Sequence, residues 1–512
     1  MEPSICTGPS GAVAAYIGID WADQKHAIAL RSAAEPSKVH HQVVEQKPEA
    51  LMEWIGHLEQ RFGAQGKILI CLEQSRGALI YHLMGYEFFE LYPVNPLQLA
   101  RYRETFSPGG AKDDRPDSEL LCELLYCHRD RLRAWKADSA LTRKLAFFNE
   151  GRREAVDQRT ALSNAIKSQL KVYFPLALVL LNEDSSTALA ADLLLRWPNL
   201  EVLQKQSANT LRKFFYGHNC RGETKMLQRL ELIQQAQPLT QDSAVIEPAA
   251  FRVQLLARQL KSLLADIARY DQKIAQLFEA HPDRLLFENL PGAGAALAPR
   301  LVTAFGSDPT RWDSAQQVAT LLGIAPVRRA SGKHTGKKAS VHFRLACPKF
   351  LRQSLHEFAG CSIRYCSWAR ACYETQRARG KAHHASVRAV AFKWIRILFA
   401  CWKQRSPYDP QRYQLALKHR GSPFANACYI YRSKNLTDQL SRLVLDRISR
   451  FVSMPANGLN KRTDLGRSQQ RKASTEVSEG SKGGRVFCVP AILPNPQQRC
   501  YTSRGLAALA AC

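Results

Sequence analysis

The sequence predicts an α/β domain at the amino terminus, followed by a helical spacer and a mostly α-helical carboxy-terminal domain. Over residues 14–137, short apolar runs alternate with amphipathic stretches, which is typical of strands and helices in one sheet-containing domain. From residue 138 to about residue 408 the apolar spacing is helical. A chain of 512 residues is also too long for a single core. We therefore expect several domains.

The chain carries a large excess of positive charge. Lys and Arg number 72 against 45 Asp and Glu, a formal net charge of +27. Such an excess destabilises a compact protein unless a polyanion binds it, so nucleic acid is the first candidate partner and an anionic membrane is the second. No apolar run approaches the roughly 20 residues needed to cross a bilayer, and Met1–Ala15 lacks a secretory pattern. We expect a cytoplasmic protein that lies at the bacterial nucleoid when DNA is bound.

The 14 cysteines do not predict a metal site. No Cys-x-x-Cys pair occurs, and the closest grouping, Cys361, Cys366 and Cys372, lacks the short paired spacing of structural zinc sites. We interpret the cysteines as thiols in a reducing compartment, with zinc binding as the less favoured alternative.

Two predicted strands of the first domain end on carboxylates. Residues 16–20 predict a strand that ends at Asp20, and the apolar residues 27–30 follow closely enough to pair with it as a hairpin. Residues 67–73 form an apolar run that suits a strand buried on both faces and ends at Glu73. A buried carboxylate is destabilising unless a metal or a cation offsets its charge. The alternative for Asp20 is a turn residue that faces water.

A further set of acidic residues lies within residues 106–122, after a Gly-Gly loop. Asp113, Asp114 and Asp117 are predicted to lie in the opening turn of a helix, where Asp114 and Asp117 share one face. Acidic side chains also stabilise a helix start, which is the alternative explanation. Four carboxylates from two strands and a helix suit a pair of Mg²⁺ or Mn²⁺ ions, which can hold both reacting oxygens of a phosphodiester. This set predicts phosphoryl transfer on nucleic acid.

These motifs resemble those of the DEDD transposases of the insertion-sequence-110/1111 family. The matching residues are Asp20 in Gly-Ile-Asp-Trp-Ala, Glu73 in Cys-Leu-Glu-Gln-Ser, and Asp114 with Asp117 in Lys-Asp-Asp-Arg-Pro-Asp-Ser. The family shows Lys-Thr-Asp-x-x-Asp-Ala in the last motif, so Asp113 stands in place of Thr and a shift of one residue stays open. The resemblance implies that residues 14–137 form an RNase H-like (RuvC-like) domain and that these four acids bind the metal.

The predicted spacer, residues 138–284, contains a heptad pattern. Apolar residues recur in alternating steps of four and three from Leu256 to Leu277. A coiled coil between two chains and packing within one helical bundle are both compatible with so short a pattern. We therefore interpret the region as a spacer that is also a candidate dimerising arm.

A second candidate site lies in the predicted transposase domain, residues 285–408. Ser331 is followed by glycine and lies among basic residues that are candidate nucleic-acid contacts, namely Arg328, Arg329, Lys333, Lys337 and Lys338. On the residues alone, a basic loop that touches phosphates is the preferred interpretation. The resemblance reverses this preference, since Gly-Ile-Ala-Pro followed by Ser-Gly matches the family motif whose serine is taken to be the strand-cleaving nucleophile.

Other features of the carboxy-terminal half favour nucleic acid less specifically. Residues 290–294 predict either a phosphate-holding glycine turn or a plain helix start. Residues 360–402 interleave basic and aromatic side chains, and we assign the basic ones to nucleic acid and most rings to packing. Residues 409–512 are predicted to be a basic, largely disordered tail.

The combined prediction is a DNA transposase or recombinase of a mobile insertion element. The resemblance implies metal-assisted cleavage by a serine nucleophile, double-stranded DNA as the substrate, and target choice by a structured bridge RNA. A dimer or tetramer is expected, because the two sites lie on separate domains. The alternative is a hydrolytic RuvC-like nuclease or junction resolvase, in which Ser331 only positions DNA. A third possibility is a non-catalytic nucleic-acid-binding protein on the same scaffold.

Overall fold

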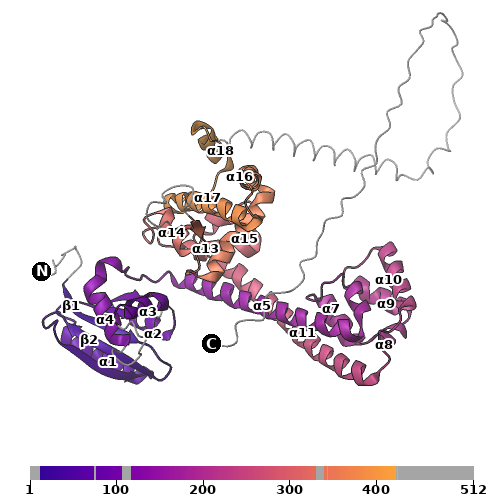
Figure 1. Cartoon of the computed structure of the whole chain (residues 1–512), viewed down its shortest axis with the longest axis horizontal. Helices are drawn as coiled ribbons and strands as arrows, with labels where there is room; N and C mark the ends of the chain where they lie inside the picture. Colours follow the sequence, from indigo (N-terminus) through magenta and orange to yellow (C-terminus); the bar gives the residue numbers. More distant parts are fainter. Residues whose placement is uncertain are drawn as a thin grey trace, which may run out of the picture. The chain divides into compact units, whose positions relative to one another are not determined.

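The computed structural model describes residues 12–73, 76–106, 117–329, 340–342, 344–422 and 424 (Figure 1). All of these residues belong to one compact unit, residues 1–439. The larger sheet lies at the amino-terminal end, and helices dominate the rest of the described chain.

The amino-terminal domain is built on a five-stranded mixed sheet. Its strands are β1 Val13–Asp20, β2 Lys25–Ser32, β3 Val39–Glu45, β4 Lys67–Leu72 and β5 Phe89–Pro93. They lie in the order β3-β2-β1-β4-β5. β1 pairs antiparallel with β2 and parallel with β4, and β5 is parallel to β4. The predicted hairpin and both carboxylate-bearing strands are confirmed.

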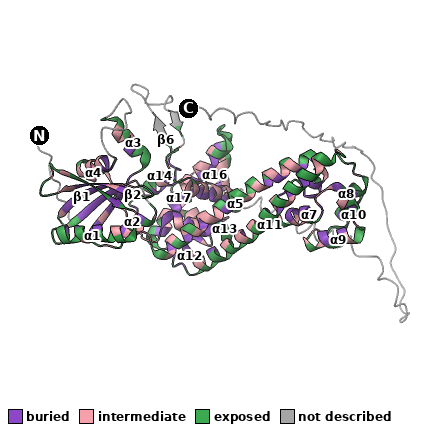
Figure 2. Cartoon of the chain, turned by 90° about the horizontal axis from the view of Figure 1, so that it is seen from below, coloured by how far each residue is buried: buried purple, intermediate pink, exposed green. Residues whose placement is uncertain are grey.

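Helices cover both faces of this sheet. The helices are α1 Pro48–Phe62, α2 Ala78–Leu83, α3 Pro96–Glu104 and α4 Asp117–His128. Ile17, Ile19 and Ile70 pack with α1 and α2 in one core. Leu69 and Cys71 point to the opposite side, where they pack with α4 in a second core. Figure 2 shows α1 and α4 on opposite sides of the sheet.

Two elements of this domain carry no clear sequence pattern. The sequence does not predict β3, because its residues Val39 to Gln42 are mostly polar and exposed. β3 is an edge strand that forms through backbone pairing with β2, from Arg31↔Val39 to Lys25↔Glu45. Helix α3 has the same difficulty, since Leu99 is its one buried residue. Neither element buries an apolar face wide enough to produce a recognisable period.

The middle of the chain forms a long helical hairpin. Helix α5 runs from Ala140 to Tyr173 and helix α11 from Ser243 to Glu279, and each is the main neighbour of the other. Leu260, Ile267 and Ile274, which belong to the predicted heptad pattern, are buried. The pattern therefore packs within the chain. A coiled coil between two chains stays a prediction.

Five shorter helices close one end of this hairpin. They are α6 Pro175–Leu180, α7 Ala188–Arg196, α8 Leu200–Gln204, α9 Ala208–Gly217 and α10 Glu223–Gln235. Trp197 and Phe215 are buried with Ile166 of α5 and Leu260 of α11 in one core. At the other end, Leu145 of α5 and Ile274 of α11 belong to the core of the carboxy-terminal helices.

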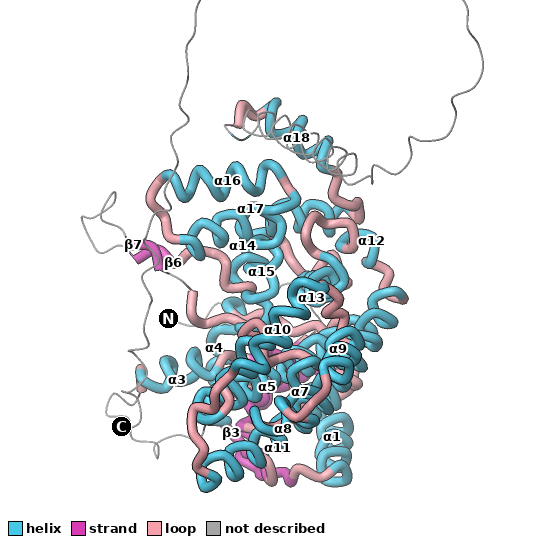
Figure 3. Tube along the Cα trace, turned by 90° about the vertical axis from the view of Figure 1, so that its right-hand side faces the viewer, coloured by secondary structure: helices cyan, strands magenta, loops and turns pink. Residues whose placement is uncertain are grey.

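The carboxy-terminal part of the described chain is a helical domain with one short strand pair (Figure 3). Its helices are α12 Arg284–Phe287, α13 Gly294–Phe305, α14 Ala315–Leu321, α15 Lys349–Tyr365, α16 Ser367–Ala378, α17 His383–Gln404 and α18 Pro410–His419. The strands β6 Val327–Arg329 and β7 Ser340–His342 pair antiparallel. The sequence predicts a tail from residue 409, whereas the structure continues as α18 to His419.

Packing explains two features of this domain. Gly292 has a positive φ of 84°, and a Cβ there would lie 2.8 Å from the backbone of Cys361 in α15. Close helix packing therefore accounts for this glycine without a phosphate. Trp368 and Trp394 are buried with ring centroids 4.7 Å apart, as expected for packing residues, while Tyr365 is exposed.

The hydropathy of the described helices indicates no membrane-spanning segment among them. None of these helices is both long and apolar enough to cross a bilayer.

Candidate active site

The sheet brings Asp20 and Glu73 to the same edge. β1 and β4 are parallel neighbours, and their register pairs Ile19 with Leu72. Asp20 is the last residue of β1 and Glu73 directly follows β4, so both carboxylates lie at the carboxyl ends of adjacent strands. Residues more than fifty positions apart in the sequence are thereby placed side by side.

Both side chains lie on the face of the sheet that α4 covers. Side chains alternate between the two faces of a strand, and Ile19 points into the core beneath α1. Asp20 therefore shares the opposite face with Gly18. Cys71 packs with α4, so Glu73 continues on that same face. Both carboxylates remain partly exposed.

Gly18 allows the start of α4 to lie directly on β1. A Cβ at this position would lie 1.9 Å from the carbonyl oxygen of Ser118 and 2.4 Å from the backbone nitrogen of Cys122. No side chain fits at such distances, so only glycine permits this contact. Asp117, the first residue of α4, is consequently held over the strand end that carries Asp20.

The electrostatic surroundings of Glu73 include two other carboxylates. Burial raises the pKa of the Glu73 carboxyl above its ordinary value, and the nearby carboxylates of Asp117 and Asp20 raise this pKa further. The Arg103 guanidinium acts in the opposite direction on the same pKa. The structure therefore places Asp117 and Asp20 near enough to Glu73 to raise its pKa, and their role as metal ligands stays a prediction.

Arg103 is a site residue that the sequence analysis missed. It lies in the last turn of α3, and its Nη2 donates a hydrogen bond of 2.5 Å to Oδ1 of Asp117. Both side chains are about a quarter to a third exposed, at 31% for Arg103 and 25% for Asp117. The available signal is weak, because Arg103 is one of several arginines in a stretch without apolar periodicity.

The remaining predicted site residues are not placed by the structure. Asp113 and Asp114 lie outside the described residues, as do Ser331, Lys333, Lys337 and Lys338. Arg328 and Arg329 are described through their backbone only, in β6, where they pair with Val341 and Ser340 of β7. The short hairpin β6–β7 therefore brackets residues 330–339, which include Ser331.

The carboxylates suit a hard divalent cation by their chemistry. Carboxylate oxygens are the ligands that Mg²⁺ and Mn²⁺ prefer. The like charges around Glu73 raise its pKa, and a divalent cation would offset that repulsion. Among the residues that the structure describes, however, no three His, Cys, Asp or Glu side chains are arranged so that they could hold a metal ion. Arg103 supplies positive charge at this position instead.

Two family models match the chain. A model described as Transposase covers residues 17–175, which include Asp20, Glu73 and Asp117. A model described as Transposase IS116/IS110/IS902 family covers residues 284–374, which include the β6–β7 hairpin.

Curated relatives agree with these matches. The mini-circle putative transposase for IS117 from Streptomyces coelicolor is 25% identical over 405 residues, which span 78% of this chain and 96% of that protein. A 43.6 kDa protein of insertion element IS110 from the same organism is 24% identical over 354 residues, 67% of this chain and 84% of that protein. The pilin gene-inverting protein of Moraxella bovis is 26% identical over 151 residues, 28% of this chain and 45% of that protein. The chain therefore carries the two domains that these transposase family models describe, and it is similar over most of its length to a putative transposase of an insertion element.

Proposed function

We propose that this transposase cleaves and exchanges DNA strands at the ends of its element by metal-assisted phosphoryl transfer with Ser331 as the nucleophile. The observation that carries the proposal is the position of Asp20 and Glu73 at one edge of the α/β sheet, with the pKa of Glu73 raised by burial and by the nearby carboxylates of Asp117 and Asp20. Isolated surface acids would repel one another less. A cluster of this kind is suited to divalent cations, which would in turn bind phosphate oxygens.

In this proposal Asp20, Glu73, Asp114 and Asp117 are the residues that would hold Mg²⁺ or Mn²⁺. A bound divalent ion would supply charge neutralisation at the scissile phosphate. The chain's own contribution is to keep the carboxylates pre-positioned, through the β1–β4 register and the Gly18 contact with α4. Arg103 would compete with the ion for Oδ1 of Asp117, because its guanidinium donates a hydrogen bond to that oxygen.

Ser331 supplies the covalent chemistry. Its hydroxyl oxygen forms a bond to the phosphorus as the bond between phosphorus and one DNA oxygen breaks, and the serine proton passes to the departing oxygen. The energy of the phosphodiester is thereby kept in a phosphoserine link. A free DNA hydroxyl later attacks this link, restores the DNA phosphodiester and releases the serine.

Trapping of the covalent link tests the proposal. Purified protein is incubated with Mg²⁺ and DNA that carries the element ends, then denatured, and the protein attached to labelled DNA is measured. Ser331→Ala should abolish the adduct while DNA binding survives. Thr335→Ala, which removes a hydroxyl four residues away, should leave the adduct unchanged. Persistence of the adduct in Ser331→Ala would refute the serine mechanism. Cleavage without any adduct in the wild type would instead identify a hydrolytic nuclease.

We further propose that the active centre is assembled from two copies of the chain. The carboxylates and Ser331 belong to separate domains matched by separate family models. Asp20→Asn and Ser331→Ala proteins, each inactive alone, are mixed under conditions that let subunits exchange. Recovery of the adduct on mixing is expected, because one composite site then has its acids from one copy and its serine from the other. No recovery would place both groups on the same copy.

Selection of DNA by a structured RNA from the element's non-coding end belongs to the same proposal. The net charge of +27 is compatible with an RNA partner in addition to DNA. Strand exchange should require the element's RNA, and ribonuclease treatment of the complex before DNA is added should abolish it. Exchange that survives this treatment would exclude guidance by RNA.

A further inference from the structure

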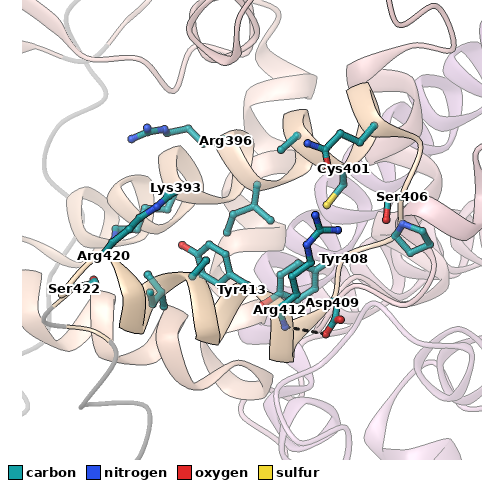
Figure 4. Close-up of a pocket in the computed structure, with 16 residues that line it drawn as sticks. Lys393, Arg396, Cys401, Ser406, Tyr408, Asp409, Arg412, Tyr413, Arg420 and Ser422 are labelled. Atoms are coloured by element: carbon teal, nitrogen blue, oxygen red, sulfur yellow. Dashed lines mark hydrogen bonds between the residues drawn. The ribbon is translucent and has the colours of Figure 1, made fainter.

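A groove separates α17 from α18 in the carboxy-terminal domain. The two helices are joined by residues 405–409 and enclose a hollow of about 530 Å³ (Figure 4). Lys393 and Arg396 line it from α17, and Arg412 lines it from α18. Arg420 follows directly after α18 and lines the same hollow. Neither family model reaches this groove, since the second ends at residue 374.

The charge on the groove is almost entirely positive. Residues 383–420 contain eight Lys and Arg but a single acidic residue, Asp409. Oδ1 of Asp409 accepts hydrogen bonds from the backbone nitrogens of Gln411 and Arg412, so this carboxylate serves as the N-cap of α18. Because this one carboxylate caps the helix, the four cationic side chains around the hollow are not balanced by acids from residues 383–420.

Three of these cations have no anionic partner within the described part of the chain. The exposed side chains of Arg396, Arg412 and Arg420 form no ion pair with any described carboxylate. Lys393 is half-buried, and burial lowers the pKa of its amine, with the nearby Arg396 lowering it further. Its Nζ lies 3.8 Å from the ring centroid of Phe424. Unpaired cations that repel one another around a cavity favour an anionic ligand.

The floor of the groove is apolar and aromatic. Leu417 and Ile397 are buried there, and Tyr408 and Tyr413 lie half-buried beside them with ring centroids 6.2 Å apart. The Tyr408 hydroxyl accepts a 2.9 Å hydrogen bond from Nε1 of Trp368, which holds the ring in place. Burial raises the pKa of Tyr413 to about 12, so this ring stays neutral at physiological pH. The floor thus offers flat apolar surface and no opposing charge.

The combination selects among anionic partners. Free phosphate would use the cations and leave the aromatic floor exposed to water. An acidic peptide would pair with the cations, but its acidic residues carry no flat ring that could stack on the aromatic floor. An unpaired nucleic-acid strand carries a phosphate at each nucleotide and a base with a flat apolar face, which matches both surfaces. In a duplex the flat faces of the bases are covered by stacking, so only its phosphates could contact the groove, at the rim.

We infer that the groove between α17 and α18 binds an unpaired nucleic-acid strand, with phosphates on the rim cations and a base on the tyrosine floor. The inference extends beyond the strand-cleavage chemistry, because the groove contains none of the proposed metal ligands and does not include Ser331. Binding there requires no divalent ion. The same contact could hold a loop of RNA or a displaced DNA strand, which share this chemistry.

The test is binding of a short fluorescent oligonucleotide to the full chain in the presence of EDTA, measured by anisotropy. The double variant Arg396→Gln/Arg412→Gln removes two exposed rim charges. A phosphate contact on a single strand contributes a slope of about 0.7 in log K against log salt, so the slope should fall by about 1.4. If the wild type and the double variant bind equally at about 1 M salt, this change in slope makes the affinity of the variant roughly 25-fold lower than that of the wild type at about 0.1 M salt.

The matched control removes the same charge elsewhere. Arg252 and Arg258 are exposed on α11 and form no ion pair with a described carboxylate, so Arg252→Gln/Arg258→Gln should bind the strand nearly as the wild type does. Equal losses in the two double variants would overturn the inference, since the charge of the whole surface would then explain binding. The Asp20→Asn and Ser331→Ala proteins should bind normally, which separates this site from the cleavage chemistry.

Changes in the oligonucleotide test the floor without disturbing the protein. Single-stranded DNA and single-stranded RNA of equal length are compared with the corresponding duplex and with an abasic strand. Tighter binding of either single strand than of the duplex, sensitive to the rim variant, supports the site and identifies the preferred strand. Equal binding of the abasic strand would overturn it, because no base would then occupy the floor. An acidic peptide of equal charge that displaces the oligonucleotide, and that loses the same affinity in the rim variant, would also overturn the inference.

Discussion

The α/β domain and the carboxy-terminal helical domain concentrate opposite charges by different means. In the α/β domain, the sheet register and one glycine contact bring Asp20, Glu73 and Asp117 together from three separate segments. In the helical domain, the cations around the groove come from two neighbouring helices and from Arg420, which directly follows α18. The acidic cluster therefore depends on long-range packing, whereas the basic groove depends on which face each helix exposes.

This difference determines how each region should respond to change. The acidic site is small and partly buried, so removing one of its groups should have a large effect on a single step. The basic groove distributes its charge over several exposed side chains, so each of them should contribute modestly and in a salt-dependent way. Four further predictions test this contrast, from the largest expected effect to the smallest.

Neutralising a single carboxylate at the strand end should nearly abolish cleavage. Asp20→Asn keeps the size of the side chain but removes its charge, and metal-assisted charge stabilisation contributes several kcal/mol, or about a thousandfold in rate. Cleavage of element-end DNA in Mg²⁺ measures this effect, with a gel-shift assay for DNA binding. Glu53→Gln, an exposed acid on α1, is the control and should leave cleavage unchanged. An active Asp20→Asn enzyme would show that the acidic cluster is not the metal site.

Filling the contact between β1 and α4 should destabilise the α/β domain. Gly18→Ala places a Cβ against the Ser118 carbonyl, and such overpacking costs about 1–3 kcal/mol in the free energy of unfolding. The midpoint of thermal unfolding should fall accordingly. Gly56→Ala in α1 is the matched control, because a Cβ there meets nothing within 4 Å and alanine favours the helix by about 0.5–1 kcal/mol. Similar behaviour of both variants would mean that α4 does not depend on close contact with Gly18.

Removing the cation that pairs with Asp117 should strengthen metal binding. Arg103→Ala frees an oxygen of Asp117. A partly exposed ion pair contributes at most about 1 kcal/mol, so the affinity for Mn²⁺ should rise by up to roughly fivefold in titration calorimetry. Arg103→Lys, which keeps the charge, should remain closer to the wild type. Weaker Mn²⁺ binding in Arg103→Ala would indicate that Arg103 positions Asp117 for the metal and does not compete with it.

A buried histidine where α5 meets the carboxy-terminal helices should produce the smallest effect. His281 Nδ1 accepts a hydrogen bond from the backbone nitrogen of Asp283, and its Nε2 lies 2.9 Å from Oγ1 of Thr142. Nε2 therefore carries the proton of a neutral ring. Burial lowers the pKa of His281 below its ordinary value. The unfolded chain thus binds a proton more readily than the folded protein does.

Stability from His281 should therefore be complete above the ordinary histidine pKa and should decline as the pH falls below it, towards the lowered pKa of the folded state. Thermal unfolding between about pH 7.5 and pH 5.5 measures this dependence. His281→Gln should flatten it, while His57→Gln, at an exposed position on α1, should not. An unchanged pH dependence in His281→Gln would assign it to other groups.

Much of the fold is predictable from local pattern. Apolar runs identify β1, β2, β4 and β5, and helical spacing identifies α1, α5 and α11, because each of these elements buries a continuous apolar face or core. β3, α3 and the β6–β7 pair escape prediction, since backbone pairing or a single anchor such as Leu99 stabilises them. For the site, Asp20 and Asp117 lie near enough to Glu73 to raise its pKa, while Asp114 and Ser331 lie outside the described residues.

By itself the sequence determined the resemblance to a transposase family, the α/β character of the first domain and the choice of Asp20, Glu73 and Asp117 as candidate ligands. These features depend on residue types and on short-range spacing, because the backbone preferences of a segment and the chemistry of a motif are set by residues close together in the sequence. Only the tertiary structure decided that α11 packs on α5, that Arg103 pairs with Asp117, and that α17 and α18 leave a basic groove between them. Contacts of this kind join segments far apart in the chain, and they depend on which surfaces bury one another when the whole chain folds.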